Sequence, residues 1–329
     1  MTLVFGTFLL SMMVLVAIAI VREHNLFVAV MLSAIFSLLM ATNLFLLDAA
    51  DVALTEAAIG AGISTVLALG ALALTAEAEQ RHRPKYRWLS IAIMVLALVA
   101  LLYSTQDNPR IGDPEAPVHQ HVAPWYLEQT PILIDIPNVV TAVLGSFRGY
   151  DTFGEVLVIL TAGIGVLFLL SAGRNDLLPN PHRIPDNTIR LRQHTIPHVI
   201  GKLLAPFIIL FGLYVQFHGE YGPGGGFQAG ALIAAGVILY GLVEGERPSL
   251  ALVPPNLLYG LSLGGVLLYG GVGIASMLLG GNFLDYSVLM TDPIAGQHWG
   301  LLLIELGVGM TVTGVLLSIY HAFAARDPH

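Results

Sequence analysis

Long apolar runs alternate with short polar segments along the whole chain. An α-helix needs about twenty mainly apolar residues to cross the hydrocarbon core of a bilayer. Nine runs approach that length, at residues 2–21, 26–47, 52–75, 87–104, 150–171, 197–217, 226–243, 256–279 and 299–321. The pattern therefore predicts an all-α integral membrane protein with about nine transmembrane helices.

Composition supports this class, since 56% of the residues are hydrophobic and only 11% are charged. The first apolar run has no basic segment before it and is too long for the core of a secretory signal, so we interpret it as a transmembrane helix. The chain has no cysteine, which excludes disulfides, thiolate metal sites and cysteine-ligated iron–sulfur clusters. We therefore expect no redox chemistry on this chain.

Basic residues predict the orientation in the membrane. When successive loops are placed on alternate sides, twelve of the fourteen Lys and Arg residues fall on one side, and only Arg110 and Arg148 fall on the other. Cytoplasmic loops carry the excess of Lys and Arg. The prediction is an external N-terminus, a cytoplasmic C-terminus and an odd number of helices. No basic patch indicates a nucleic-acid partner.

Two polar segments interrupt the apolar pattern. Residues 105–138 are rich in Pro, acidic residues and His, and an apolar stretch, "VVTAVLGSF", follows them with the character of an interfacial helix. Residues 172–196 contain several Pro and Arg residues and are predicted to form a cytoplasmic connector. This connector divides the predicted helices into groups of five and four.

Three carboxylates lie inside predicted membrane helices: Glu56, Glu155 and Glu305. An ionisable residue within the bilayer costs about 2.5 kcal/mol or more and usually faces protein, a partner charge or water. All three helices enter the membrane from the predicted external side, so the three residues, chiefly Glu56 and Glu305, are candidates for an ion path in its outer part. The alternative is purely structural, because Asp51 and Asp151 resemble N-caps and a nearby Glu favours the positive end of a helix dipole.

Lys202 is the basic residue inside a predicted helix, near the cytoplasmic end of the sixth. Its ammonium group either reaches the interface along its flexible stem or pairs with a buried carboxylate or lipid. His218 and His298 lie at predicted external helix ends and are candidate proton-entry residues, because imidazole titrates near neutral pH. No zinc-binding spacing such as H-E-x-x-H occurs, so no bound metal is predicted.

A glycine-rich stretch, "HGEYGPGGGFQAG", occupies residues 218–230 between the sixth and seventh predicted helices. A phosphate-binding loop is excluded, because no strand precedes the stretch and no Gly-Lys-Ser/Thr follows it. Gly224, Gly225 and Gly226 permit positive φ and a close approach of the backbone to a neighbouring helix or ion. Packing and ion contact explain these glycines equally well at this level.

Four segments resemble one family in order along the chain. "FHGEYGPGGGFQAG" and "LLLIELGVGMTVTG" resemble the B-type component of Mrp-type (Mnh) multisubunit cation/proton antiporters, called MrpB or MnhB. "DVALTEAAIGAGISTVLALGAL" and "NVVTAVLGSFRGYDTFGEVLVILTAG" are similar to two pieces of the C-terminal part of the large component, MrpA. In membrane-bound hydrogenases the similar pieces are separate proteins of three, two and four helices, called MbhD, MbhE and MbhF.

This resemblance implies an MbhD-like segment at 1–80, an MbhE-like segment at 81–175 with an external loop at 105–149, a connector at 176–196 and an MrpB/MbhF-like domain at 197–329. The carried-over residues of interest are Asp51, Glu56, Asp151, Glu155, His218, Gly224, Gly225, Gly226 and Glu305. The long antiporter-like half of MrpA is not found in this sequence, so we expect it on a separate partner.

The resemblance implies that the chain is part of a transporter and is not an enzyme. It implies a multi-pass protein of the bacterial or archaeal cytoplasmic membrane, with Na⁺ and H⁺ as transported ions and no cofactor. The implied partners are antiporter-like large subunits, small C-, E-, F- and G-type subunits and membrane lipids. Three alternatives stay open: a membrane-bound hydrogenase or related redox complex, a related complex that moves another substrate, and a structural scaffold without an ion path.

Overall fold

The computed structural model of the chain describes residues 2–72, 87–110, 112–171 and 195–324. Within these ranges the regular elements are all helices. Among the described residues eight helices are long and apolar enough to cross a membrane, and the remaining predicted helix, at 87–104, is present as α5 (Arg87–Ser104), which is apolar but shorter. The predicted all-α membrane class is therefore confirmed, whereas the orientation of the termini stays a prediction.

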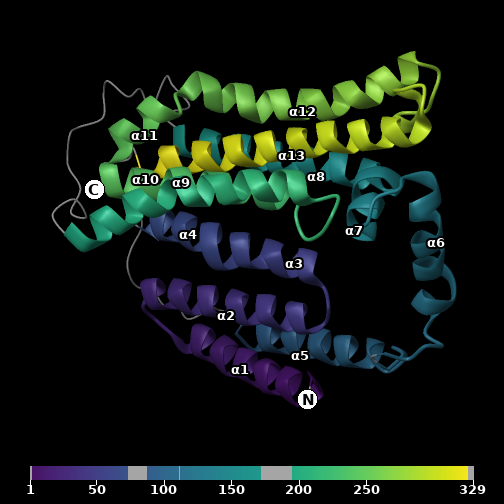
Figure 1. Cartoon of the computed structure of the whole chain (residues 1–329). Coiled ribbons are helices and arrows are strands. Elements are labelled where there is room, and N and C mark those ends of the chain that lie inside the picture. Colours follow the sequence, from purple (N-terminus) through teal and green to yellow (C-terminus); the bar gives the residue numbers. More distant parts are fainter. Residues whose placement is uncertain (1, 73–86, 111, 172–194, 325–329) are drawn as a thin grey trace.

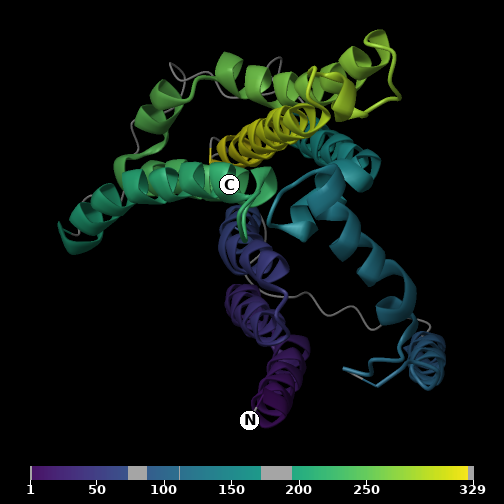
Figure 2. The same ribbon diagram turned by 45° about the vertical axis from the view of Figure 1, so that its right-hand side comes forward.

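The N-terminal segment is a row of three apolar spans, stacked side by side from α1 to the centre of the molecule (Figures 1 and 2). The third span is one continuous helix over Ala50–Leu72, but its middle part is a π-helix that begins at Glu56. The elements of this segment are α1 (Thr2–Arg22), α2 (Leu26–Leu46), α3 (Ala50–Thr55), η1 (Glu56–Ile63) and α4 (Ser64–Leu72).

The middle segment contains more helix than its sequence pattern predicts. The predicted loop at 105–149 holds η2 (Val118–Val122), α6 (Ala123–Leu133), α7 (Val139–Thr141) and η3 (Ala142–Phe147) before α8 (Gly149–Ser171). Proline in the first turn favours the start of α6, since its missing N–H is not needed there. One face of the apolar stretch of α7 and η3 packs against the protein, because Ala142 is fully buried and Gly145 lies against the Leu301 side chain, whereas Val140 and Leu144 are exposed.

Helix α5 stands apart from the other helices (Figure 2). All of its described side chains, at residues 88–104, are exposed within this chain. A helix that is apolar on every side is stable only where lipid or other protein surrounds it. Lipid or protein other than the described residues must therefore surround it in the membrane.

The C-terminal segment is a group of four long helices around a tightly packed pair (Figure 1). Helices α10 and α13 are the most buried of the candidate membrane spans. A Cβ at Gly230 would lie 2.7 Å from the Gly309 carbonyl oxygen, and a Cβ at Gly226 would overlap the Glu305 carbonyl oxygen. Small residues allow membrane helices to approach this closely. The elements are α9 (Thr195–His218), α10 (Gly226–Glu244), α11 (Glu246–Leu252), α12 (Pro255–Leu278), η6 (Tyr286–Val288) and α13 (Pro293–Ala324).

Two boundaries in this segment differ from the prediction. Helix α13 begins at Pro293, six residues earlier than expected, because Pro suits the first helical position and the Asp292 carboxylate accepts a hydrogen bond from the Ile294 N–H. Helix α11 was not predicted and follows Gly245, whose φ of 104° permits the turn. Most of the predicted connector at 176–196 lies outside the described residues.

Candidate functional site

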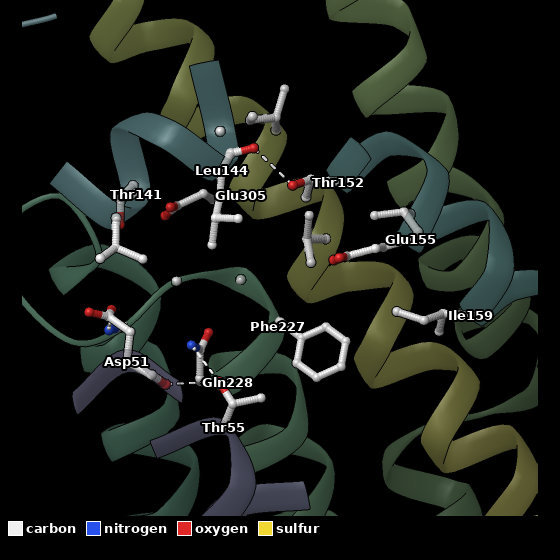
Figure 3. A pocket seen from close by; sticks show the side chains of 18 of the residues that line it. Asp51, Thr55, Thr141, Leu144, Thr152, Glu155, Ile159, Phe227, Gln228 and Glu305 are labelled. Atoms are coloured by element: carbon white, nitrogen blue, oxygen red, sulfur yellow. Dashed lines mark hydrogen bonds between the residues drawn. The ribbon is translucent and has the colours of Figure 1, made fainter. Parts of the chain in front are cut away.

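A cavity of about 580 Å³ lies where the three segments of the chain meet (Figure 3). Each segment contributes one carboxylate to its wall: Asp51 from α3, Glu155 from α8 and Glu305 from α13. Helices α8 and α10 begin beside it, so their positive ends favour ionised groups there. The structure thus brings together three of the carboxylates that the sequence singled out.

The carboxylates approach the cavity from different sides (Figure 3). Glu305 and Asp51 lie on the side of Thr141, whereas Glu155 points inward from the other side, where the Phe227 ring also lies. Much of the remaining wall is apolar side chains. Carboxylates in such surroundings are costly to ionise unless a cation, a proton or water accompanies them.

The glycine-rich turn lies directly on Glu305. Gly225 has a φ of 125°, which other residues rarely adopt. A Cβ at Gly219 would lie 3.0 Å from Glu305 Oε2, and one at Gly225 would lie 3.5 Å from Glu305 Oε1. The glycines therefore serve close packing and bring the backbone beside a candidate carboxylate at the same time.

Asn138 holds this turn in place. Its Nδ2 donates hydrogen bonds to the carbonyl oxygens of Gly219 at 3.0 Å and Gly222 at 2.9 Å, and its backbone N–H donates to the Glu220 carbonyl at 3.0 Å. Thr141 Oγ1 donates a further bond to the Gly219 carbonyl at 2.7 Å. Sequence reasoning did not single out Asn138, because the residues that it binds are about eighty positions away.

Asp51 connects the first segment to the same turn. Its Oδ1 accepts hydrogen bonds from the Gly224 N–H and from Asn138 Nδ2, both at 3.3 Å. Close by, Gln228 Nε2 donates to Thr55 Oγ1 at 2.8 Å. The prediction that Asp51 is an N-cap is wrong, because Ala49 occupies the cap position and Asp51 lies in the first turn.

Two of the predicted acidic residues lie outside the cavity wall. Glu56 is partly buried, and its carboxylate lies against Gly60 of its own helix, at a point where Ser37 of α2 also approaches. Asp151 is exposed in the first turn of α8 and accepts a hydrogen bond from Arg148 Nε at 2.7 Å. Asp151 is therefore not an N-cap either, and its ion pair lies on the surface.

The two predicted histidines flank the glycine-rich turn without lining the cavity. His298 Nδ1 lies 3.1 Å from Glu220 Oε2, and this position is inside α13 rather than at its end. The His218 ring stacks on Tyr214 with 4.8 Å between centroids. The pairing of His298 with Glu220 depends on the fold and was not predicted.

Lys202 lies at the other end of α9, away from the cavity. Its Nζ is 2.8 Å from Oε1 of Glu244, whose side chain is only 10% exposed. Of the alternatives that the sequence left open, the structure thus shows the pairing with a buried carboxylate. His198 Nε2 approaches the same oxygen at 3.5 Å.

Family models match three successive stretches of the chain. Residues 11–77 match the MbhD model and residues 85–177 match the MbhE model, which describe the D and E subunits of MBH. Residues 196–318 match a domain related to the MnhB subunit of Na⁺/H⁺ antiporters.

Curated proteins are similar over parts of the chain. Protein MJ1307 of Methanocaldococcus jannaschii is 35% identical over 174 residues, half of this chain and 66% of that protein. A probable A/B-type component of a K⁺/H⁺ antiporter from Rhizobium meliloti is 27% identical over 64% of this chain, which spans 23% of the relative. The B-type component of the Na⁺/H⁺ antiporter of Bacillus subtilis is 30% identical over 38% of this chain and 90% of its own length.

Two solved structures have a similar fold. A chain of the Mrp complex from Dietzia sp. DQ12-45-1b matches 98% of this chain over 35% of its own length, with a TM-score of 0.76 and 24% identity. A chain of the membrane-bound sulfane sulfur reductase, an archaeal respiratory membrane complex, matches 73% of this chain over its full length, with a TM-score of 0.53 and 25% identity.

Proposed function

The chain belongs to the MnhB-related family of Na⁺/H⁺ antiporter subunits, with MbhD- and MbhE-type segments ahead of its MnhB-type segment, and from this premise we propose that it is a membrane subunit of a multisubunit monovalent cation/proton antiporter. The proposed location is the cytoplasmic membrane of a bacterium or archaeon. Na⁺ and H⁺ are the proposed transported ions, and the proposal includes no cofactor.

The observation that carries the proposal is the meeting of Asp51, Glu155 and Glu305 at one cavity. Ionisable residues at membrane depth mark ion pathways, and irregular backbone is tolerated there where it lines a cavity. The glycine-rich turn supplies such backbone beside Glu305. Carboxylates and exposed backbone groups are the ligands that transporters use for Na⁺ and H⁺.

Exchange follows from competition at these carboxylates. Desolvation favours a protonated carboxyl, whereas a nearby cation favours the ionised form, so one bound ion disfavours the other. We propose that Glu305 and Glu155 are the principal ion-binding groups and that Asp51 also positions the turn through Gly224. His298 with Glu220, and His218, lie beside the turn and are proposed as proton-entry residues.

The proposed partners are separately encoded antiporter-like large subunits and small C-, E-, F- and G-type subunits, together with lipids. The exposed apolar surface of α5 supports an assembly of this kind, because the side chains of that helix are not covered by other described residues of the chain. No nucleic-acid partner is proposed.

The test is cation-dependent ΔpH in everted vesicles that contain the full complex. Glu305→Gln removes the negative charge of a proposed ion-binding group and is expected to lower exchange about tenfold or more. A tenfold loss corresponds to about 1.4 kcal/mol of ion-binding free energy. Glu128→Gln, at an exposed position on α6, is the matched control and should exchange like wild type. Wild-type exchange in an assembled Glu305→Gln complex contradicts the proposed ion site.

A redox complex is the second candidate, because the match to the sulfur reductase covers the whole of that chain. In that case the same module would couple ion movement to electron transfer. Mass spectrometry of the purified native complex separates the two functions. Hydrogenase or sulfur reductase subunits in the complex would support the second candidate, and antiporter-like subunits without them would support the first.

A scaffold role makes a different prediction for the carboxylate variants. If Asp51, Glu155 and Glu305 only stabilise the fold, neutral substitutions should loosen assembly while the assembled fraction exchanges ions normally. Size-exclusion yield and exchange per assembled complex, measured on the same preparation, separate the two outcomes.

A further inference from the structure

A second group of ionisable side chains is buried at the end of the four-helix segment opposite the cavity. Helix α10 begins at the cavity with Gly226 and ends at Glu244, so the two regions are about 27 Å apart at 1.5 Å per residue. Glu244, Glu246 and His321 are all largely shielded from solvent there. The proposed ion site does not use them.

His321 and Glu246 form the more deeply buried pair. His321, near the end of α13, is 0% exposed, and its Nδ1 lies 3.5 Å from Oε1 of Glu246, whose side chain is 11% exposed. Within the described residues neither ring nitrogen of His321, nor this carboxylate oxygen, has a hydrogen-bond partner. The Tyr320 ring lies edge-on to the imidazole at 5.2 Å between centroids.

Gly245 places two carboxylates on either side of one turn. Its φ of 104° ends α10 and starts α11, so that Glu244 faces α9 while Glu246 faces α13. Glu244 has two cationic neighbours on α9, Lys202 at 2.8 Å and His198 at 3.5 Å. The charge of Glu244 is thus compensated by α9, whereas Glu246 pairs with His321 of α13.

Packing alone does not account for the buried imidazole. Leaving a buried polar group without a hydrogen bond destabilises the folded protein, so an apolar residue of similar size would be more stable at position 321. A buried polar group without a hydrogen bond needs an explanation, and a role in chemistry or ion binding is one of them. A carboxyl next to an imidazole is a suitable pair for binding and passing a proton.

We propose that His321 and Glu246 form a proton-binding site at the end of the four-helix segment opposite the cavity. With one shared proton the pair is neutral, either as carboxylic acid and imidazole or as carboxylate and imidazolium. Removing that proton leaves a net negative charge in a poorly solvated place, and adding another leaves a positive one, so both steps are costly. The pair therefore retains one proton. This proton can move between Glu246 Oε1 and His321 Nδ1 while the net charge of the pair stays zero.

The titratable and charged residues around the pair lie on some of the neighbouring helices and not on others. Helix α4, which packs on α13 through Phe323, contains no titratable residue. The titratable or charged residues on the other helices of this region are His198 and Lys202 on α9, Tyr240 and Glu244 on α10, Arg247 on α11, Tyr259 on α12 and Tyr320 on α13.

The electrostatics of Glu246 agree with proton binding. Burial raises the pKa of the Glu246 carboxyl, and the neighbouring His321 ring partly offsets this increase. A carboxyl whose pKa is raised in the folded protein binds its proton more tightly than in the unfolded chain. Its contribution to stability is therefore present at low pH and is lost as pH rises through the raised pKa.

The proposed proton site depends on the proposed antiporter function only for the first of two tests, which measures transport. In vesicles with the full complex, His321→Gln is expected to move the pH profile of exchange upward by about one unit, because Glu246 loses the neighbour that opposes its raised pKa. Glu246→Gln should remove that pH-dependent step, and Glu246→Asp should restore it. His119→Gln, at an exposed position, is the control and should leave the profile unchanged.

A second measurement does not depend on transport. Infrared difference spectra of the purified complex, recorded across the pH range, should contain the carbonyl band of a protonated carboxyl that Glu246→Gln removes and Glu246→Asp retains. Equal bands in these two variants, or unchanged pH profiles in both His321→Gln and Glu246→Gln, overturn the proposal. If wild type shows no cation-dependent exchange, the proposed function fails, and the infrared comparison still decides on the proton site.

Discussion

Asn138 is the residue that ties the middle segment to the glycine-rich turn. Besides its bonds to the turn, its Oδ1 accepts hydrogen bonds from the Val140 and Thr141 N–H groups, so it is also the N-cap of α7. One side chain thus starts a helix and positions the backbone beside Glu305. An exposed Asn of the same chain, such as Asn108, performs neither task.

Asn138→Ala should therefore destabilise the complex by roughly 1–3 kcal/mol, because the Gly222 carbonyl loses its Asn138 donor and the Gly219 carbonyl keeps only the bond from Thr141. A lower thermal transition of the purified complex, with weaker cation-dependent exchange, is the expected result. Asn108→Ala is the control and should behave like wild type. Equal transitions for the two variants would show that the turn holds its shape without Asn138.

The roles of some residues can be recognised from the surrounding sequence, and the roles of others cannot. Glu305 and Glu155 could be recognised because a carboxylate among apolar residues is unusual wherever its helix lies. Glu244 could not, because it ends an apolar run and resembles a solvated helix end until Lys202 and His198 are found beside it. Asp51 was correctly singled out, although its expected capping role was wrong.

At the scale of elements, the packing of α10 on α13 determines the shape of the cavity. Gly226 and Gly230 of α10 meet the backbone of α13 at Glu305 and Gly309. These contacts leave no room for a side chain, and they place the Glu305 carboxylate directly under the turn.

We expect Gly226→Ala to force the two helices apart, because its methyl group would overlap the Glu305 carbonyl oxygen. Overpacking of this kind costs about 1–3 kcal/mol or more. Gly271→Ala on α12, where nothing lies within 4 Å of the new Cβ, is the matched control. Assembly yield and exchange should fall for Gly226→Ala alone, and equal losses for both variants would contradict this account.

π-Helical turns occur in two of the elements around the cavity. One, η1, directly follows the cavity residue Thr55, and the other, η3, includes the cavity residues Leu144 and Gly145. Such turns are rare and often occur at functional sites, because the wider turn changes the direction of side chains. The apolar pattern predicted both stretches as helical or interfacial but carried no signal for the wider turn.

At the scale of the whole molecule, the middle and C-terminal segments are joined by buried polar contacts. Tyr269 Oη donates a hydrogen bond to the Gly149 carbonyl at 2.7 Å, and Tyr286 Oη donates to the Gly145 carbonyl at 2.9 Å. Both tyrosines are 0% exposed. Such an interface should hold without a covalent connection between the segments.

We therefore predict that the chain, divided after residue 185 and coexpressed as two pieces with the other subunits, still assembles and exchanges ions. Copurification of the pieces is the measurement. Combining Tyr269→Phe with Tyr286→Phe in the divided chain should reduce their association, since two buried carbonyl groups lose their donors. Tyr103→Phe, at an exposed position, is the control. Recovery of the two pieces separately, without substitution, would contradict the prediction.

By itself, the sequence determined the all-α membrane class, most helix positions, the resemblance to antiporter subunits and the unusual carboxylates. Each of these depends on residues close together in the chain, because the bilayer imposes its length and polarity on every helix separately. Tertiary structure alone decided that Asp51, Glu155 and Glu305 share a cavity, that Glu56 and Asp151 do not, and that Glu246 meets His321. These outcomes depend on distances between helices far apart in sequence, where glycine contacts and single hydrogen bonds such as those of Asn138 determine which side chains meet.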